Sequence, residues 1–463
     1  MLRLYSTIHR AVVEFEPRDE GKVSIYVCGP TVQSEPHVGH GRSAVAFDVI
    51  RRYLIWRGYE VTYVRNITDV EDKIIAAAAE TGESVETLAV RMAERFATSF
   101  TALGVLPPDV EPKATDHIPE MIELIQQLID RGLAYPSGGD VYFSVRAWDE
   151  YGRLSGRNPD ELRAGVRIEP GESKQDPLDF ALWKGAKPGE PEWDSPWGAG
   201  RPGWHIECSA MAERYLGPDF DIHGGGTDLI FPHHENEIAQ SEGASGSTFA
   251  RYWLHNGMVN LGGEKMAKST GNLVDLESII ARRGGRSLRL LFLRANYRSP
   301  IDFSDELLDD AEDALDRLTR FRQRAEPGSP DEEAMGQFRQ AMDDDFGTPQ
   351  AISLLFDLVR EGNRVLDEGG DPSAIAGAVE EIVAVLGIDA AVAKTADSID
   401  LGELSARFGL EGEAEEVVDR LIELRSVARA EHRYADADEI REGLERAGVI
   451  VEDGPDGTRW LRR

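Results

Sequence analysis

Residues 23–54 constrain the fold more strongly than any other stretch of the chain. A β-branched and aromatic run at residues 23–27 is broken by Gly29 and Pro30, and an amphipathic helical pattern begins near His40. This order predicts a strand, a loop and a helix, the first unit of an α/β sheet. In an open α/β sheet, ligands bind beyond the carboxyl ends of the strands. The loop before His40 is therefore the first candidate for a binding site.

This loop carries side chains suited to a nucleotide. It places Cys28 at the strand end and the tetrapeptide His37-Val38-Gly39-His40 at the start of the helix. Helix N-termini offer free N–H groups to phosphate, and Gly39 has no side chain to hold a nucleotide away from the backbone. The imidazoles of His37 and His40 can donate hydrogen bonds to phosphate oxygens or to charge that develops on a transferring phosphoryl group. These features predict phosphate binding.

The remaining sequence predicts an α/β domain with further domains attached. Residues 58–67 give a second buried strand and residues 68–72 supply helix-capping side chains, so the βα unit repeats and implies a Rossmann-type, doubly wound parallel sheet. No GxGxxG fingerprint is present, which argues against a dehydrogenase. We assign 1–115 and 197–261 to two halves of a nucleotide-binding domain, 116–196 to an inserted connective domain, 262–305 to a region with a lysine-paired loop, 306–400 to an α-helical bundle and 401–463 to a small C-terminal α+β domain.

Local patterns support these assignments. The strand at 220–223 is expected to end before three glycines, on which a nucleotide could lie flat, followed by Asp228. The final unit is predicted to be a helix at 435–447 and a hairpin around a Gly-Pro-Asp-Gly turn, and a third bundle helix is predicted at 372–386. Two apolar stripes at helical spacing predict the first bundle helices: Leu308, Ala311, Leu315 and Leu318; Ile352, Leu355, Phe356 and Val359.

The charge of the chain opposes long-range attraction to nucleic acid. Net charge is −33, from 84 acidic and 51 basic side chains. The best local exception is the acid-free stretch 282–298, which is either an amphipathic helix with solvated arginines or a phosphate-contacting surface. The sequence contains no apolar run of about 18 residues, so it predicts no membrane span. The N-terminal segment lacks the apolar core of a signal peptide, which favours a cytoplasmic location.

Four residues form a candidate metal site. Pro232 is expected at the first position of a helix, which would place His233 and Glu237 four residues apart on one face. Cys28 and Cys208, the only two cysteines, are expected at two strand ends of one sheet. Two sulfurs, one nitrogen and one oxygen suit tetrahedral zinc. Two alternatives stay open: both cysteines are inert core residues, or the neighbouring His234 and Glu235 take the ligand roles.

Several motifs together resemble the cysteinyl-tRNA synthetases, a family of class I aminoacyl-tRNA synthetases. The tetrapeptide at 37–40 and the lysine loop at 265–269 resemble the two class I signatures, in the expected order. The resemblance extends over essentially the whole chain, including MDDDFGTPQA and the C-terminal ADEIREGLERAGVIVED. The motifs that carry it are SIYVCGPTV (24–32), NITDVEDKI (66–74), GWHIECSAMA (203–212), DIHGGGTDLIFPHHENEIAQSE (221–242) and GGEKMAKSTGN (262–272).

The resemblance implies a function and a set of roles. The expected reaction is activation of L-cysteine by ATP, supplied with Mg²⁺, and transfer to tRNA(Cys), with one zinc ion per chain binding the substrate thiolate. Residues 262–305 would include contacts to the tRNA stem, residues 401–463 would bind the anticodon, and a monomer is the expected assembly. The implied site residues are Cys28, Cys208, His233 and Glu237 for zinc; His37, Gly39, His40, Asp228, Lys265 and Lys268 for ATP and catalysis; and Cys28, Thr68, Trp204, His205 and His223 for cysteine.

Two departures from the family pattern and two competing functions remain at this stage. Ala267 stands where the lysine loop usually has serine, and residues 33–36 replace commoner aromatic and acidic residues. One competitor is the related ligase that joins cysteine to an amino sugar in mycothiol synthesis, which should lack the C-terminal extension. The other is a noncatalytic paralogue, against which the retained lysines and motif histidines argue.

Overall fold

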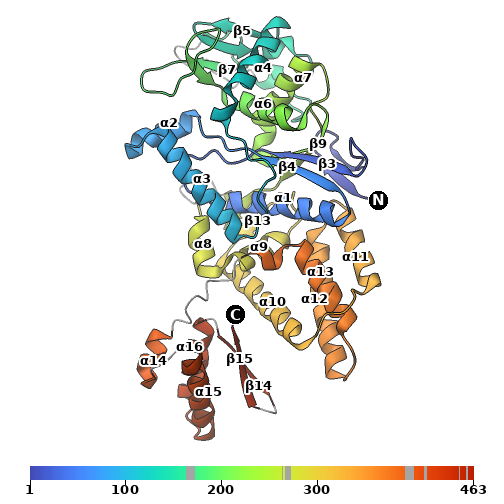
Figure 1. Cartoon of the computed structure of the whole chain (residues 1–463), viewed down its shortest axis with the longest axis vertical. Coiled ribbons are helices and arrows are strands. Elements are labelled where there is room, and N and C mark those ends of the chain that lie inside the picture. The colour runs from blue at the N-terminus through green and yellow to red at the C-terminus, as the bar shows by residue number, and fades with distance from the viewer. Residues whose placement is uncertain are drawn as a thin grey trace.

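A computed structural model describes residues 1–162, 173–262, 264–265, 273–391, 401–410, 414–447, 449–454 and 457–462. Its central domain is built on the predicted parallel sheet, in the order β10 (Ala250–Asn256), β9 (Phe220–Gly226), β3 (Lys22–Val27), β4 (Glu60–Arg65). Helix α1 (Val38–Trp56) covers one face, and α6 (Trp204–Leu216) and α7 (Glu235–Ser245) cover the other (Figure 1). The doubly wound α/β prediction is therefore confirmed.

Successive side chains of β3 point to opposite faces of the sheet and pack into two different hydrophobic cores. Ile25 and Val27 pack in the cluster that contains α1, whereas Tyr26 packs in the cluster that contains α6 and α7. The glycines after His223 lie inside β9 rather than after it, which corrects the predicted strand end. At Gly224 an added Cβ would lie 2.3 Å from the ring of Phe47, so glycine is needed for α1 to pack closely on the sheet.

One predicted element is wrong. Cys208 was expected at a strand end, but residues 204–216 form helix α6. Almost every residue in its first half is buried, because α6 lies between the sheet and the inserted domain. A helix that is buried nearly all round shows no apolar stripe at a period of 3.6 residues, so its sequence gives no clear helical pattern.

The inserted region forms its own antiparallel sheet above the central domain (Figure 1). Its strands are β5 (Ala134–Ser137), β6 (Asp140–Phe143), β7 (Phe180–Gly185) and β8 (Gly200–Pro202), paired in that order. Helices α4 (Ile118–Asp130) and the short α5 (Pro159–Leu162) belong to the same region. Helices α2 (Asp72–Thr81) and α3 (Val85–Ala102) follow β4, and an unpredicted hairpin, β1 (Arg3–Ser6) with β2 (Ala11–Glu14), precedes the sheet.

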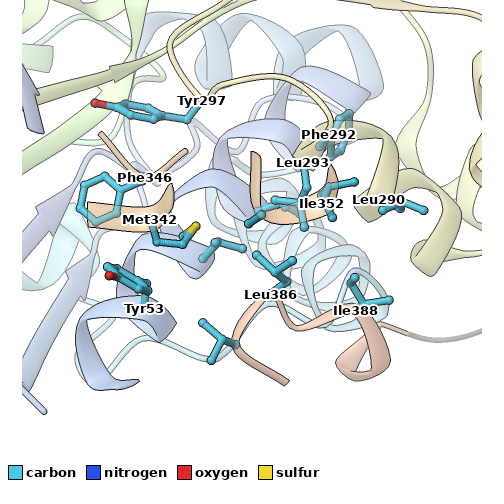
Figure 2. Close-up of a cluster of buried hydrophobic side chains, with 14 of the residues drawn as sticks. Tyr53, Leu290, Phe292, Leu293, Tyr297, Met342, Phe346, Ile352, Leu386 and Ile388 are labelled. Atoms are coloured by element: carbon cyan, nitrogen blue, oxygen red, sulfur yellow. The ribbon is translucent and has the colours of Figure 1, made fainter. Parts of the chain in front are cut away.

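A helical bundle packs against the other side of the core. Strands β11 (Val259–Leu261), β12 (Glu264–Lys265) and β13 (Ile301–Phe303) and helices α8 (Leu276–Arg283) and α9 (Gly285–Leu293) lead into α10 (Asp305–Arg324), α11 (Glu332–Asp343), α12 (Thr348–Asp367) and α13 (Ser373–Val385). The predicted stripe on α10 is buried, and α11 was not predicted. Figure 2 shows Tyr53 of α1 in one buried cluster with Leu290 of α9, Met342 of α11 and Ile352 of α12.

The arginines of 282–298 are not simply solvated. Arg282 bonds to Asp305 at 2.8 Å, Arg286 to Asp389 at 2.9 Å and Arg298 to Asp345 at 2.6 Å. Arg283 pairs with Asp309 and Glu312 of α10, and Arg289 pairs with Asp48 of α1 in a fully buried contact. Most arginines of this stretch therefore pair with acidic side chains of other elements, and contact with phosphate stays a prediction.

The C-terminal unit has a separate core. It contains α14 (Gly402–Phe408), α15 (Ala414–Ala430), α16 (Tyr434–Arg446) and the hairpin β14 (Val449–Gly454) with β15 (Gly457–Arg462). The predicted helix and hairpin are present, and α15 is an additional element. Leu404, Val418, Leu421 and Leu444 centre a hydrophobic cluster that contains no residue from before 401. Across the described segments, no helix is both long and apolar enough to cross a membrane.

Candidate active site

A cleft of about 400 Å³ opens beyond the carboxyl ends of β3 and β9, at the start of α1. Residues from the two strand ends, side chains from α6 and the segment before α7 meet there. The structure brings most of the predicted site residues into this one cleft: Cys28, His37, Gly39, His40, Thr68, Trp204, Cys208, Asp228 and His233 line it.

The two motif histidines cap α1. His37 is the N-cap residue, and its Nδ1 accepts a hydrogen bond from the N–H of Gly39 at 3.2 Å. The Nδ1 atom of His40 accepts from the N–H of His37 at 3.2 Å, which completes a reciprocal capping box. Their rings stack with centroids 3.7 Å apart, and Phe96 packs edge-on against His40.

This capping fixes where each histidine carries its proton. Burial lowers the pKa of His37, and burial with the neighbouring His37 lowers the pKa of His40 well below its ordinary value, so both imidazoles are neutral at pH 7. Because both Nδ1 atoms accept from the backbone, we assign both protons to Nε2. Each ring can therefore donate from Nε2, which is what a phosphate oxygen needs.

Four potential ligands converge behind this cleft. One ligand atom from each of Cys28, Cys208, His233 and Glu237 lies within 4.8 Å of the others. The two sulfurs are 3.5 Å apart, the Cys28 sulfur is 3.4 Å from Oε1 of Glu237, and Nε2 of His233 is 3.1 Å from that same oxygen. The i and i+4 spacing does place His233 beside Glu237, although Pro232 follows a cis peptide bond and α7 begins only at Glu235.

The donor set fits a zinc ion. Both cysteines are free thiols, and burial raises the pKa of Cys28 well above its ordinary value and raises that of Cys208. Burial likewise keeps His233 neutral by lowering its pKa. The set offers two sulfurs, an imidazole and a carboxylate, which are soft and borderline ligands. Four such ligands suit tetrahedral zinc.

The neighbouring histidines support this set from behind. Nδ1 of His205 lies 2.9 Å from Nδ1 of His233, and Nε2 of His223 lies 2.8 Å from Oε2 of Glu237. Neither His205 nor His223 lines the cleft; His223 is fully buried and His205 is half-buried, so the structure places these two predicted cysteine-binding residues beside the ligand candidates instead. Such contacts orient ligand side chains.

Glu235 and His234, the two alternative ligands, make contacts of their own in the structure. Glu235 accepts hydrogen bonds from backbone N–H groups of Gly152, Leu154 and Ser155, which turns its carboxylate toward the inserted domain. His234 bonds through Nδ1 to His255, and its Nε2 has no hydrogen-bond partner. A second set of four, Cys28, His223, His234 and Glu237, is also geometrically close, but it contains only one sulfur.

The lysine loop ends beside the motif histidines. Lys265 in β12 pairs through its backbone with Asn260 in β11, and Leu273, at the far side of the loop, lines the cleft. After it, the N–H of Val38 donates to the carbonyl of Val274 at 3.0 Å, which joins this segment to the start of α1. Lys268 and Ala267 lie outside the described residues, as does the side chain of Lys265.

The unusual segment at 33–36 is anchored by charge. Glu35 forms an ion pair with Arg95 of α3, and Arg95 also bonds to Glu277 of α8 at 3.0 Å. The carbonyl of Pro36 accepts from the N–H of Leu276 at 3.0 Å. These contacts bind the segment before His37 to the helix that follows the lysine loop.

Sequence reasoning missed several contributors to the site. Lys73 lies over the ring of Trp204 at 5.5 Å, and that ring packs against His233 with centroids 4.3 Å apart. Asn66 accepts from the N–H of Gly29 at 2.8 Å and holds the loop after β3. The motif at 66–74 contained both Asn66 and Lys73, so it was the available signal, but nothing in it specified these contacts.

Three family models match the chain. A model described as the tRNA synthetases class I (C) catalytic domain matches residues 14–313, a DALR domain model matches 337–390, and a cysteinyl-tRNA ligase anticodon binding domain model matches 411–460. The second and third matches fall within the helical bundle and the C-terminal unit.

Curated relatives match over the full length. The chain is 49% identical to the cysteine–tRNA ligase of Syntrophotalea carbinolica over 482 residues and 49% identical to that of Halorhodospira halophila over 467 residues, covering 100% of both chains in each case. It is 47% identical to the ligase of Syntrophobacter fumaroxidans, covering 99% of each chain.

Solved structures match the fold at low identity. A methionyl-tRNA synthetase from Mycobacterium tuberculosis in complex with methionyl-adenylate gives a TM-score of 0.57 at 18% identity, covering 79% of this chain and 90% of that one. A LeuRS from Agrobacterium radiobacter, in a ternary complex with tRNA, gives a TM-score of 0.59 at 13% identity, covering 97% of this chain and 92% of that one. These likenesses show a shared fold.

Proposed function

The chain belongs to the cysteine–tRNA ligase family of class I aminoacyl-tRNA synthetases, and from that premise we propose that it joins L-cysteine to ATP and then to tRNA(Cys). The observation that carries this proposal is the single cleft that holds the nucleotide motif and three of the four metal-ligand candidates, with Glu237, the fourth, close to them. In the first step the cysteine carboxylate attacks the α-phosphorus of ATP. Pyrophosphate leaves, and a cysteinyl adenylate results.

The metal site would select the amino acid. Cys28, Cys208, His233 and Glu237 would hold zinc, which when bound would supply a soft Lewis acid that favours a thiolate sulfur over a hydroxyl oxygen. Serine and alanine lack that sulfur, so one polar contact can discriminate where an apolar pocket cannot. Three of these ligands line the same cleft as Trp204, which places the selecting group beside a wall of the proposed amino-acid pocket.

The chain's own residues would position the nucleotide. Nε2 of His37 and of His40 would donate to the phosphates from the start of α1, where Gly39 leaves the backbone open. Asp228 lies across the same cleft, where a carboxylate can accept from ribose hydroxyls. Mg²⁺ would arrive with ATP as part of the substrate. Phosphoryl-type transfer gains mainly from positioning and charge stabilisation, which these groups supply.

The two loop lysines would supply the positive charge. The described end of the loop at Val274 bonds to the start of α1, and β11, the strand that pairs with Lys265, reaches the cleft at Val259, so Lys265 and Lys268 belong to a segment attached at the cleft. We propose that their ammonium groups neutralise the charge that develops on the triphosphate as pyrophosphate leaves. Ala267 removes a hydroxyl from this loop but neither cation.

Thr68 would help to shape the amino-acid pocket. It is buried at the cleft wall, and its Oγ1 lies 3.3 Å from Nδ2 of Asn66. Its N–H donates to the carbonyl of Pro30 at 3.2 Å, which fixes it beside the loop after β3. The C-terminal unit, which matches the anticodon-binding model, would hold the anticodon arm of the tRNA.

The test is cysteine-dependent ATP–pyrophosphate exchange, with serine as the competing substrate, followed by charging of tRNA. Exchange and charging with cysteine but not serine are expected. Lys268→Ala should lower the exchange rate, whereas Lys187→Ala, which changes an exposed lysine of the inserted domain, should not. Exchange without charging would instead favour an amino-sugar ligase, and the absence of exchange would indicate a noncatalytic paralogue.

A further inference from the structure

Tyr26 lies directly beneath the four ligand candidates. It sits in the middle of β3, paired with Val64 of β4 and His223 of β9, and its side chain is fully buried. Side chains two residues apart in a strand point to the same face, so Tyr26 and Cys28 both face α6, the helix that carries Cys208.

Its hydroxyl group has no partner of ordinary hydrogen-bond geometry. The Tyr26 oxygen is shielded from solvent and unbonded. Burial raises the pKa of Tyr26 well above its ordinary value. Its ring centroid lies 5.4 Å from that of His223, which contacts Oε2 of Glu237, and Cys208 packs in the same hydrophobic cluster as Tyr26. Tyr26 therefore packs beside members of the proposed metal set.

The Cys208 sulfur would need a donor once it is ionised. As a thiol it points toward Oδ1 of Asn66 at 3.7 Å, but a thiolate cannot donate, and that oxygen already accepts from Gly29. The amide nitrogen of Asn66 is directed to Thr68 at 3.3 Å. The Tyr26 O–H is a buried donor without a hydrogen-bond partner, on the sheet face that α6 covers.

We propose that Tyr26 is a positioning residue that donates a hydrogen bond from its hydroxyl to the Cys208 thiolate when that sulfur binds metal. This inference rests on the zinc site of the proposed function and adds to it a residue outside the ligand set. A hydrogen bond to a coordinated thiolate stabilises its negative charge and fixes its direction. It would also satisfy a hydroxyl that is otherwise buried without a partner, which links metal binding to the stability of the central strand.

The experiment compares wild type, Tyr26→Phe and Tyr53→Phe. Tyr53 is the matched control because it is equally buried, but its hydroxyl bonds to Asp343 at 2.6 Å in the other core. Each metal-free protein is titrated with Co²⁺, which reports thiolate ligation through sulfur-to-metal charge-transfer absorption. Zinc affinity is measured by competition with a chromophoric chelator, and thermal unfolding is followed with and without Zn²⁺.

We expect Tyr26→Phe to bind zinc 10- to 100-fold more weakly, the range typical for loss of such a partner. Its charge-transfer band should move to longer wavelength, because the sulfur lone pair loses the stabilising hydrogen bond. The melting temperature should be unchanged or raised in the metal-free protein, from which an unbonded hydroxyl is removed, and lowered in the zinc-loaded protein. Tyr53→Phe should lower the melting temperature of both forms equally and leave the affinity and the band unchanged.

The outcomes separate this inference from the proposed function. In one outcome, wild type shows the charge-transfer bands while Tyr26→Phe shows the same band position and the same zinc affinity. That result would overturn the role of Tyr26 and leave the metal site intact. An equal change in melting temperature of both forms with unchanged affinity would show packing alone and would likewise overturn it. No thiolate bands in wild type would overturn the metal site itself, and the role of Tyr26 with it.

Discussion

Replacing Arg289 by Met should destabilise the catalytic core far more than the same replacement of Arg282. Both arginines lie on the consecutive helices α8 and α9, and each pairs with an aspartate of another helix. The two variants therefore remove the same charge and the same donor group. They differ in burial, because Arg289 and Asp48 are 0% exposed, whereas Arg282 is 56% and Asp305 is 54% exposed.

The contacts of Arg289 determine how much its replacement lowers the free energy of unfolding. Its guanidinium also donates to the carbonyls of Leu386 at 2.8 Å and Leu103 at 2.9 Å, so its loss leaves two buried acceptors and one carboxylate short of a donor. Breaking a buried ion pair costs about 3–5 kcal/mol. Asp48 keeps a donor from Arg52 at 2.7 Å, which places the charge contribution near the lower limit, and the two carbonyls add about 1 kcal/mol each. The expected total is about 5 kcal/mol.

Urea unfolding, followed by tryptophan fluorescence, measures the difference. With a denaturant slope of about 3 kcal/mol per molar for the core transition, Arg289→Met should lower the midpoint by about 1 M or more. Arg282→Met should lower it by less than about 0.3 M, since an exposed ion pair contributes about 0–1 kcal/mol. Equal shifts in the two variants would refute the reasoning that burial, rather than the charge pair itself, determines the cost.

Three further predictions concern protons, metal and domains. Burial lowers the pKa of His37, His40, His205, His233, His234 and His255, to about 3 for His205 and His255, so the unfolded chain binds protons more readily than the metal-free folded protein. Stability should therefore fall as pH drops below about 6.5, and a melting temperature that is the same at pH 7.5 and 5.5 would contradict buried neutral histidines. Cys208→Ser should abolish bound zinc, and an unchanged zinc content by atomic absorption would remove this residue from the ligand set. Deleting residues 401–463, which have their own core, should spare ATP–pyrophosphate exchange but weaken tRNA charging, and equal loss of both activities would contradict separable domains.

The catalytic fold was predictable where its local signals agreed. At residues 23–40, strand propensity, a Gly-Pro break and a capping position occur in the order that the structure uses. Helix α6 lacked such agreement, because burial on several sides removed its apolar stripe and left Cys208 on the wrong type of element. Helix α11 was missed, although it buries Met335, Phe338 and Met342.

The candidate site was predictable in its residues but not in its layers. The i and i+4 spacing connected His233 with Glu237, whereas Cys28 and Cys208 meet them only through the packing of α6 on the sheet. Sequence offered no way to predict that His205 contacts His233 instead of lining the cleft. That distinction depends on side-chain direction at the start of α6, which the neighbouring elements determine.

The ion pairs of the acid-free stretch give part of the excess acid a structural role. In the described part of the chain, Arg283, Arg286 and Arg298 pair with carboxylates of other elements. The acids of the bundle thereby hold in place the helices that follow the lysine loop. Arg322 extends this pattern, since it joins Glu380 to Asp389, the same carboxylate that Arg286 contacts. Part of the excess acid is therefore structural, and it connects the bundle to the helices beside the cleft.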